Sequence, residues 1–507
     1  MSVFFEFSQS VRKIQSEPIG ATLVSLLSDS AVYLMGAVLI GLGSIVLVPL
    51  YTRTLGPREF GVYALVDITV LLVVTVTTLK MDVSYLKWFA DIGPSRHGIL
   101  LGSMLLTGLV MSAVGGSALF VFVRSRAGVQ WLQQSTNDLA WTLVPIVILE
   151  NLQALLLTDL RARRKPWKYS CVAIVRLLGV VAASLYFLSV KQMGLYGVFL
   201  GRLVGDVAAF LPLTAFCARL IIFRVTPSLI RPMIWFGLPL VWSVFAVMFQ
   251  DASGRYFLSR YGSLEQVGFL GAAVKIGAVF QMLIANPFGI AWGGVLFQVA
   301  KQSQARIIFS TIFNYVCLLT LGSALILSLF GSTLFHIFAP PSFYPAMVIL
   351  PLIFLVRSMS VIEQPASTGV YVSGRTDLLA ISYTVALITN LVLLRVLVPG
   401  YGLVGTGVAW LSGAAVVPVL FLCFGQSRYR LHFRFRVLAP PVLLWIAFIG
   451  ASRHWKLDDS GHPVFYAALL SVFVGAVLGL TISNDFRRLR KQTRRSASIP
   501  TLEASPR

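Results

Sequence analysis

The segments RTLGPREFGVYAL at residues 53–65 and RYGSLEQVGFLGA at residues 260–272 share one pattern. Each segment begins with an arginine and carries a glycine eight residues later, and the two patterns are 207 residues apart. Leu and Glu lie between the arginine and that glycine in both segments. Repetition at a fixed offset indicates that a chain is built from related structural units.

A second pair of segments supports nearly the same period. GLYGVFLGRLVG from Gly194 matches GLVGTGVAWLSG from Gly402, with identical glycines at the first, fourth and twelfth positions and an offset of 208. Two independent matches with almost one offset predict that the chain contains two related halves.

The composition predicts an integral membrane protein. Of 507 residues, 57% are hydrophobic and only 12% are charged, and the mean hydropathy is +0.84. A helix needs about 20 apolar residues to cross the hydrocarbon core of a bilayer. Fourteen apolar blocks are candidate spans, with 437–451 the shortest, at 31–50, 60–79, 98–123, 139–157, 170–190, 194–218, 233–254, 267–287, 308–330, 344–364, 378–398, 402–424, 437–451 and 464–482.

Blocks this long and apolar predict helices, because barrel strands would alternate over shorter runs. We therefore expect an all-α polytopic membrane protein with about 14 transmembrane helices. Six spans in each half give the halves the same orientation, as in parallel-repeat transporters that bind substrate between halves. The predicted parts are an N-terminal cytoplasmic segment (1–29), two six-helix bundles (30–220 and 221–426), two additional helices (427–484) and a basic cytoplasmic tail (485–507).

The basic residues predict the topology. With the N-terminus in the cytoplasm, 27 of the 41 lysines and arginines fall in cytoplasmic segments and 10 on the opposite face. The positive-inside rule then places both termini in the cytoplasm. The net charge of +22 is therefore mostly topological, and we expect anionic lipid rather than nucleic acid as its partner. The first 28 residues show no signal-peptide pattern.

Ionisable residues inside the spans are the candidate functional residues, because each costs about 2.5–3.5 kcal/mol at the centre of a membrane helix. Arg202 and Asp206 are four residues apart on one helix, as are Asp251 and Arg255. Each pair is interpreted either as a structural ion pair or as part of a ligand site.

Asp67 and Lys275 are 208 residues apart, so they occupy equivalent positions in the two halves with opposite charges. One hypothesis places both in a central aqueous cavity, where Lys275 binds an anion and Asp67 balances it or couples a cation. The alternative is a buried ion pair or a position at the lipid interface.

Arg176 and Arg357 have no acidic residue three or four positions away, so we expect them to be unpaired and to bind an anion. The fork of a guanidinium group fits a phosphate or diphosphate well. Together with Arg202 and Lys275, they are the predicted substrate-binding cations. The predicted ion-coupling acids are Asp67, Glu150 and Glu363.

The sequence contains no HExxH, GxSxG, Walker or GxGxxG motif, and its five histidines do not cluster. Four scattered cysteines have no metal-ligand spacing. We therefore expect a transporter rather than an enzyme, without a metal or other cofactor. The loops are too short for the catalytic domain of a membrane polymerase or glycosyltransferase, and an assembly subunit without transport activity is a further alternative.

Over nearly its whole length the chain resembles the polysaccharide transporter (Wzx-type flippase) family of the multidrug/oligosaccharidyl-lipid/polysaccharide superfamily. The resemblance rests on PLYTRTLGPREFGVYAL at 49–65, LLLTDLRARRKPWKYS at 155–170 and GLYGVFLGRLVGD at 194–206. It implies a V-shaped pair of helical bundles in the bacterial inner membrane. It also implies a cationic cavity that carries a lipid-diphosphate-linked oligosaccharide to the outer leaflet, driven by a proton or sodium gradient.

Two related transporter classes remain alternatives. One is the flippase for the peptidoglycan lipid precursor (MurJ-like), and the other is a drug/cation antiporter, which predicts a cavity dominated by acids. The loop motif fits the polysaccharide branch better. Polymerases and other polysaccharide assembly proteins are candidate partners.

Overall fold

The computed structural model describes residues 46–132, 137–224, 226–300, 305–375, 377–429 and 443–445. These residues contain helices and connecting turns but no strand, which confirms the predicted all-α class. The predictions for 1–29, 464–482 and 485–507, and for most of 31–50 and 437–451, lie outside the described residues. The span count of fourteen and the cytoplasmic termini therefore stay predictions.

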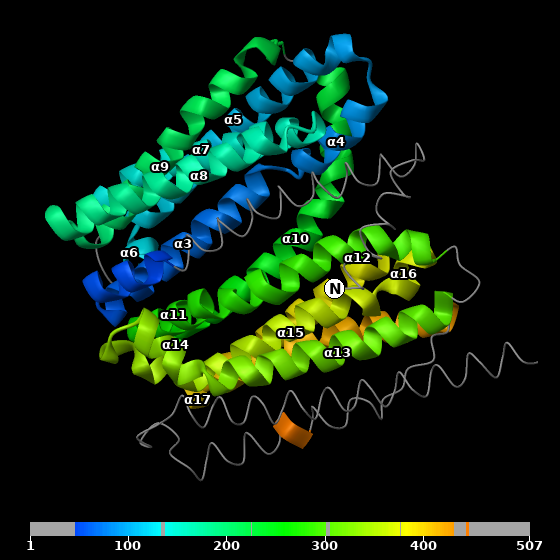
Figure 1. Ribbon diagram of the computed structural model, residues 1–507. Coiled ribbons are helices and arrows are strands. Elements are labelled where there is room, and N and C mark those ends of the chain that lie inside the picture. The colour runs from blue at the N-terminus through cyan, green and yellow to red at the C-terminus, as the bar shows by residue number, and fades with distance from the viewer. Residues whose placement is uncertain are drawn as a thin grey trace, which may run out of the picture.

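The helices form two groups that lie side by side (Figure 1). Residues 46–54 are helical and precede the first group. The first group consists of α3 (Pro57–Thr77), α4 (Met81–Asp91), α5 (His97–Arg124), α6 (Arg126–Leu132), α7 (Asn137–Ala162), α8 (Pro166–Leu185) with the π-helical turn η2 (Tyr186–Val190), and α9 (Gly194–Cys217); the short 3-10 turns are η1 (Pro94–Arg96) and η3 (Ala218–Leu220).

The second group begins with the long helix α10, which also packs on α3 and α4 of the first group. It consists of α10 (Pro227–Tyr261), α11 (Leu264–Phe280), the π-helical turn η4 (Gln281–Ala285), α12 (Asn286–Val299), α13 (Ala305–Leu329), α14 (Gly331–Phe338), the 3-10 segment η5 (Pro341–Ile349), α15 (Leu350–Ala366), α16 (Thr368–Val372) and α17 (Asp377–Arg428).

Ten helical stretches among the described residues are long and apolar enough to cross a membrane. The last, at residues 377–427, contains two predicted spans, because Gly402 has non-helical angles of φ 50° and ψ −122°. A Cβ on Gly413 would lie 2.9 Å from the Asn390 side chain, so α17 folds back on itself at Gly402. The eleven spans predicted between residues 60 and 424 each correspond to a helix.

The helix after each short turn starts in the same way in both halves. Gly194 has φ 53° and Gly402, which is 208 residues later, has φ 50°. Glycine adopts this left-handed backbone at no steric cost. Gly201 and Gly205 then bring α9 against Ser184 and Val180 of α8, as expected for small residues at a membrane helix interface.

The opening pattern of the sequence forms the closest contact between the two groups. A Cβ on Gly61 of α3 would lie 2.0 Å from the Leu264 carbonyl oxygen, and a Cβ on Gly268 of α11 would lie 1.9 Å from the Pro57 carbonyl oxygen. Gly268 is 207 residues after Gly61, and Leu264 is 207 residues after Pro57, so the two contacts join equivalent positions of the repeat. The helices that carry the repeated pattern therefore cross each other in a nearly symmetric manner.

Larger side chains at this crossing should prevent the two groups from packing together. We expect Gly61→Leu and Gly268→Leu each to lower the yield of folded, detergent-stable protein sharply, since backbone atoms cannot move aside as a flexible side chain can. Gly56→Ala is the matched control, because nothing lies within 4 Å of its Cβ position. Size-exclusion chromatography of fluorescent fusions measures the effect, and a stable Gly61→Leu variant would contradict the close crossing.

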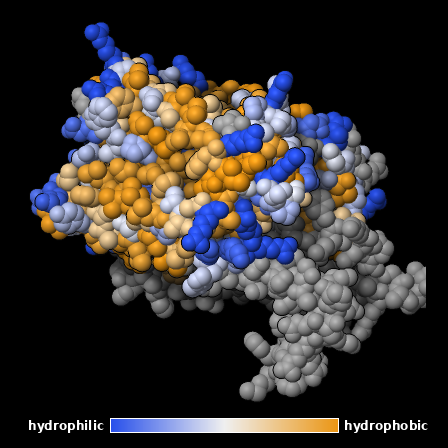
Figure 2. All heavy atoms as spheres, turned by 90° about the horizontal axis from the view of Figure 1, so that it is seen from above, coloured by the Kyte–Doolittle hydropathy of each residue, from blue (hydrophilic) through white to orange (hydrophobic). Residues whose placement is uncertain are grey.

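The outer surface of the helices suits a lipid environment. Figure 2 shows a broad hydrophobic area on one face, with the most hydrophilic side chains around and beside it. Exposed apolar side chains include Leu178 at 62% and Leu211 at 64% of full exposure. An apolar exterior this extensive is stable in lipid and unstable in water. The chain is a multi-pass membrane protein.

Candidate functional site

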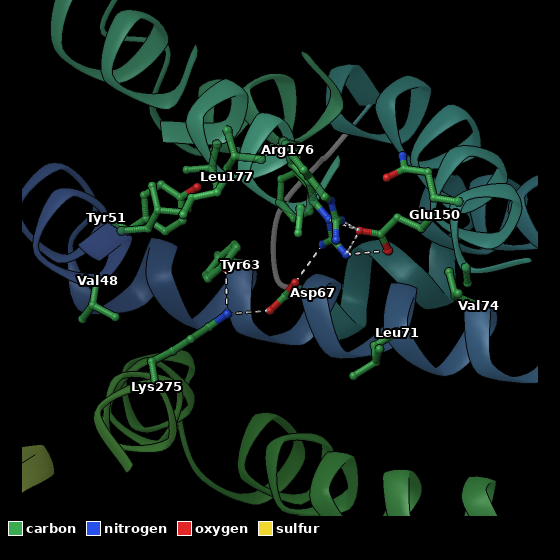
Figure 3. Close-up of a pocket in the computed structure, with 18 of the residues that line it drawn as sticks. Val48, Tyr51, Tyr63, Asp67, Leu71, Val74, Glu150, Arg176, Leu177 and Lys275 are labelled. Carbon is green, nitrogen blue, oxygen red and sulfur yellow. Dashed lines mark hydrogen bonds and ion pairs between the residues drawn. The ribbon is translucent and has the colours of Figure 1, made fainter. Parts of the chain in front are cut away.

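The main candidate site is a cavity of about 490 Å³ with apolar walls and charged groups at its centre (Figure 3). Four helices of the first group, α3, α7, α8 and α9, form most of its wall, with residues 47, 48 and 51 at one side. Lys275 of α11 is the one lining residue that the second group contributes among the described residues. The cavity therefore lies largely inside the first group, rather than midway between two halves.

Ion pairs connect the helices around this cavity. The Arg176 guanidinium on α8 donates to a Glu150 carboxylate oxygen on α7 and, from Nε, to Asp206 Oδ1 on α9 at 2.7 Å. Arg202 on α9 binds both carboxylate oxygens of Glu150 through Nε and Nη2, each at 2.9 Å. Its Nη1 donates to Asp67 Oδ1 on α3 at 2.8 Å.

The chain of ion pairs ends at the contact between the two groups. Lys275 Nζ lies 3.1 Å from Asp67 Oδ2 and 3.0 Å from the Tyr63 hydroxyl (Figure 3). Asp67 thus bridges Arg202 of its own group and Lys275 of the other group. The two residues form an ion pair and both line the cavity, while the anion-binding role of Lys275 and the coupling role of Asp67 stay predictions.

Positive and negative groups balance in this network. The side chains are half-buried or buried, and Asp206 is fully buried. Charges held so deep in a membrane protein are stable only when they are paired. The cations are Arg176, Arg202 and Lys275, and the anions are Asp67, Glu150 and Asp206.

The prediction that Arg176 and Arg357 are unpaired is wrong. Arg176 binds Glu150 and Asp206 from two neighbouring helices, and Arg357 Nη1 lies 3.3 Å from Asp251 Oδ2. Sequence spacing can identify only acidic partners on the same helix, three or four residues away. The expected pairing of Arg202 with Asp206, four residues away, is also replaced, since Arg202 binds acids of other helices.

The second expected pair, Asp251 and Arg255, is likewise not a carboxylate pair. Arg255 Nη1 donates to the backbone carbonyl oxygen of Asp251 at 2.9 Å, while the Asp251 carboxylate binds Arg357. Arg255 and Arg357 do not line the central cavity. The structure therefore brings together three of the four predicted cations, and Arg357 lies apart.

Glu363 lies at a separate cavity of about 270 Å³ in the second group. Its Oε1 accepts a hydrogen bond from the Tyr383 hydroxyl at 3.3 Å. Aromatic side chains supply much of the wall, including Trp292, Tyr371 and Phe421. Among the described residues this carboxylate has no ion-pair partner, which distinguishes it from Asp67 and Glu150.

The polar lining residues that the sequence did not indicate include Tyr51, Tyr63 and Gln153. Tyr63 holds Lys275, Tyr51 forms a hydrogen bond with Ser184 at 3.1 Å, and Gln153 Nε2 donates to the Asp206 carbonyl oxygen at 3.0 Å. Tyr63 precedes Asp67 by four residues and therefore shares its helix face. That spacing was a usable signal for Tyr63, whereas neutral Tyr51 and Gln153 gave none.

A known family matches residues 26–300, which is more than half of the chain, and its description is "Polysaccharide biosynthesis protein". The chain belongs to this family. The match covers every helix around the central cavity, including α11 with Lys275. No curated protein shows a significant sequence match.

Solved structures of transporters share the fold. The structure "Lipid II flippase MurJ, inward closed conformation" is 13% identical, with a TM-score of 0.71 over 91% of this chain and 99% of that one. A multidrug resistance MATE family transporter of the MOP superfamily in an inward-facing conformation is 13% identical, with a TM-score of 0.57 over 78% and 94%. The MATE multidrug transporter DinF-BH is 16% identical, with a TM-score of 0.60 over 82% and 96%.

Proposed function

We propose that this protein is a flippase in the bacterial cytoplasmic membrane. Its substrate is a polysaccharide repeat unit linked to a lipid through a diphosphate, and it carries the substrate from the cytoplasmic to the outer leaflet by alternating access. The observation that carries the proposal is the cavity at membrane depth, where two arginines and a lysine meet between apolar walls. The family match supports the glycan class.

The three cations suit a diphosphate because arginine binds phosphate oxygens through two parallel hydrogen bonds. Carboxylate oxygens now occupy these donors on Arg176, Arg202 and Lys275. A diphosphate supplies the same acceptor chemistry, so it binds by replacing carboxylates rather than by entering an empty cationic pocket. Substrate binding then keeps the cations paired, while each displaced carboxylate needs a proton or another cation in exchange.

The exchange also provides a way to move the two groups of helices. Asp67 and Lys275 form an ion pair between the groups, so a diphosphate that takes Lys275 removes this connection. A ligand shifts a conformational equilibrium only through unequal interactions with the two states. Without substrate, separating the two groups breaks the Asp67–Lys275 pair. With a diphosphate bound to Lys275 that pair is already absent, so the bound substrate favours the separated state.

The competing transporter classes predict other cavities or substrates. An antiporter for organic cations needs an excess of acids, but cations equal acids in the central network. A flippase for the peptidoglycan precursor would use the same diphosphate chemistry, so only the substrate itself separates that alternative.

Reconstitution tests the proposed function. Liposomes receive the purified protein and a labelled undecaprenyl-diphosphate oligosaccharide, and an external glycan-modifying enzyme reports how much substrate is accessible. We expect protein-dependent translocation of this lipid, little translocation of the peptidoglycan precursor, and no uptake of an organic cation. Absence of translocation with and without an ion gradient would contradict the flippase proposal, and preference for the precursor would favour the MurJ-like alternative.

We further propose that Glu363 carries the coupling proton or sodium ion. It is a carboxylate without an ion-pair partner among the described residues, and it lies at a cavity separate from the central network. We expect Glu363→Gln to remove the stimulation of translocation by a proton or sodium gradient while gradient-independent equilibration continues. Gln364→Asn, at the same cavity, is the control that should keep the stimulation, and an unchanged gradient response in Glu363→Gln would exclude this role.

A further inference from the structure

The turn between α7 and α8 extends two walls of the central cavity. On α7 the lining residues include Glu150, Ala154 and Leu157, and on α8 the lining begins at Tyr169. Residues three or four positions apart lie on one face of a helix. Arg161 is four residues after Leu157, and Lys165 is four residues before Tyr169. The cavity-lining face of α7 therefore continues into Arg161, and Lys165 is the N-cap residue of α8, whose carbonyl oxygen accepts a hydrogen bond from the Tyr169 backbone N–H at 3.2 Å.

One arginine fixes this turn to the rest of the protein. Arg163 Nε lies 2.9 Å from both carboxylate oxygens of Asp159, which is fully buried. Asp159 also accepts a hydrogen bond from the Tyr85 hydroxyl of α4 at 2.6 Å. Arg164 then adopts a left-handed backbone with φ 52°. The fixed geometry holds the neighbouring basic residues between the ends of two helices, α7 and α8, that line the cavity.

Three cations of the turn remain available to a ligand. Arg161, Arg164 and Lys165 are exposed, and none forms an ion pair within the part of the chain that the structure describes. Arg161 uses only Nη2, in a hydrogen bond to Thr158 Oγ1 at 2.9 Å. We call Arg161, Arg164 and Lys165 the basic turn. Its surplus of positive charge contrasts with the balanced network deeper in the cavity.

We propose that the basic turn is a capture site for the diphosphate headgroup of a membrane lipid, on the side of the membrane predicted to be cytoplasmic. This inference rests on the proposed function, because it places a first binding site before the central one. Trp167 is 76% exposed beside the turn, as is common for tryptophan at a membrane interface. The ligand therefore meets the turn at headgroup depth.

The path from the capture site to the central network is short and continuous. Seven residues separate Tyr169 from Arg176 on α8, which corresponds to about 10 Å along a helix. Both residues line the same cavity. Lys165 of the basic turn is eleven residues from Arg176, so a diphosphate that leaves the basic turn reaches Arg176 after three helical turns, about 16 Å, with cations at both ends of the path. A general attraction to anionic lipid would need no such alignment with the cavity.

Lipid binding is compared between a variant of the basic turn and a matched control variant. Nanodiscs of phosphatidylcholine contain the full-length protein and either undecaprenyl diphosphate or phosphatidylglycerol at equal lipid charge. The test variant carries Arg161→Gln, Arg164→Gln and Lys165→Gln. The control carries Arg219→Gln, Arg224→Gln and Arg231→Gln, which removes three exposed charges from the same predicted side, so any topological signal falls equally.

We expect the wild type and the control to bind undecaprenyl diphosphate roughly tenfold more tightly than the test variant. Inorganic diphosphate should compete with this binding. Equal binding by all three proteins, or equal loss in the control, would overturn the proposal. Equally tight binding of phosphatidylglycerol would also overturn it, because the turn would then be a contact for anionic lipid in general. Binding requires no transport, so a protein that binds at the turn but does not translocate would refute only the proposed function.

Discussion

Replacing Lys275 by glutamine is expected to lower the rate of oligosaccharide translocation by roughly tenfold or more. Lys275 is the cation that the second group of helices contributes to the central cavity, and it lies 3.1 Å from Asp67. Without it, a diphosphate has no partner on the second group. Lys275→Arg should retain most of the rate because it keeps the positive charge. Initial rates in proteoliposomes measure both variants.

The double variant Asp67→Asn/Lys275→Gln distinguishes substrate binding from a structural ion pair. In Asp67→Asn alone, Lys275 loses its ion-pair partner among the described residues, so the variant should be less stable. Removing both charges should restore thermal stability, as a double-mutant cycle detects, without restoring translocation. Recovery of stability and translocation together would show that the pair is only structural.

Replacing Arg202 by glutamine is expected to abolish translocation and also to destabilise the protein. Arg202 makes three hydrogen bonds, two to Glu150 and one to Asp67. Removing one partner of a buried ion pair costs about 3–5 kcal/mol because the remaining charge loses its compensation. Glu150 keeps Arg176 and Asp67 keeps Lys275, which places the loss at the lower end of that range. Thermal unfolding in detergent and translocation rates are the measurements.

Arg202→Lys tests whether the guanidinium fork itself is needed. An ammonium group cannot reach both oxygens of Glu150 and the Asp67 carboxylate with the planar geometry of arginine, so we expect little recovery of translocation. Arg375→Gln is the control, because the Arg375–Asp377 pair is exposed and lies outside the cavity, and it should behave as the wild type. Full activity of Arg202→Lys would contradict a role for the fork in binding the diphosphate.

The repeated pattern in the sequence predicted the fold further than composition did. Apolar blocks predicted the helices and the repeat predicted two related halves, but the sequence did not predict that Gly61 and Gly268 form the crossing between the groups of helices. Gly194 and Gly402 likewise share a left-handed backbone. Local backbone geometry and close approach require glycine at these positions, which explains why both copies of the repeat carry it there.

The ion-pair partners of the charged residues were not predictable from one sequence. The partners of Arg176 come from α7 and α9, and those of Arg202 come from α3 and α7. Sequence spacing identifies neighbours on one helix, whereas these contacts depend on how several helices pack. The repeat also predicted a site midway between the halves. The cavity lies mainly in the first group because only Lys275 enters it from the second among the described residues.

Photocrosslinking shows whether the diphosphate-linked glycan enters the cavity of the first group. Leu177 lines the cavity, whereas its neighbour Leu178 is 62% exposed on the outer surface. A photoreactive amino acid is placed at one position or the other, and the protein is illuminated with a glycan-labelled lipid diphosphate in proteoliposomes. Entry into this cavity predicts strong labelling from position 177 that excess unlabelled substrate removes, and only weak labelling from position 178. Equal labelling from both positions, or none from position 177, would contradict it.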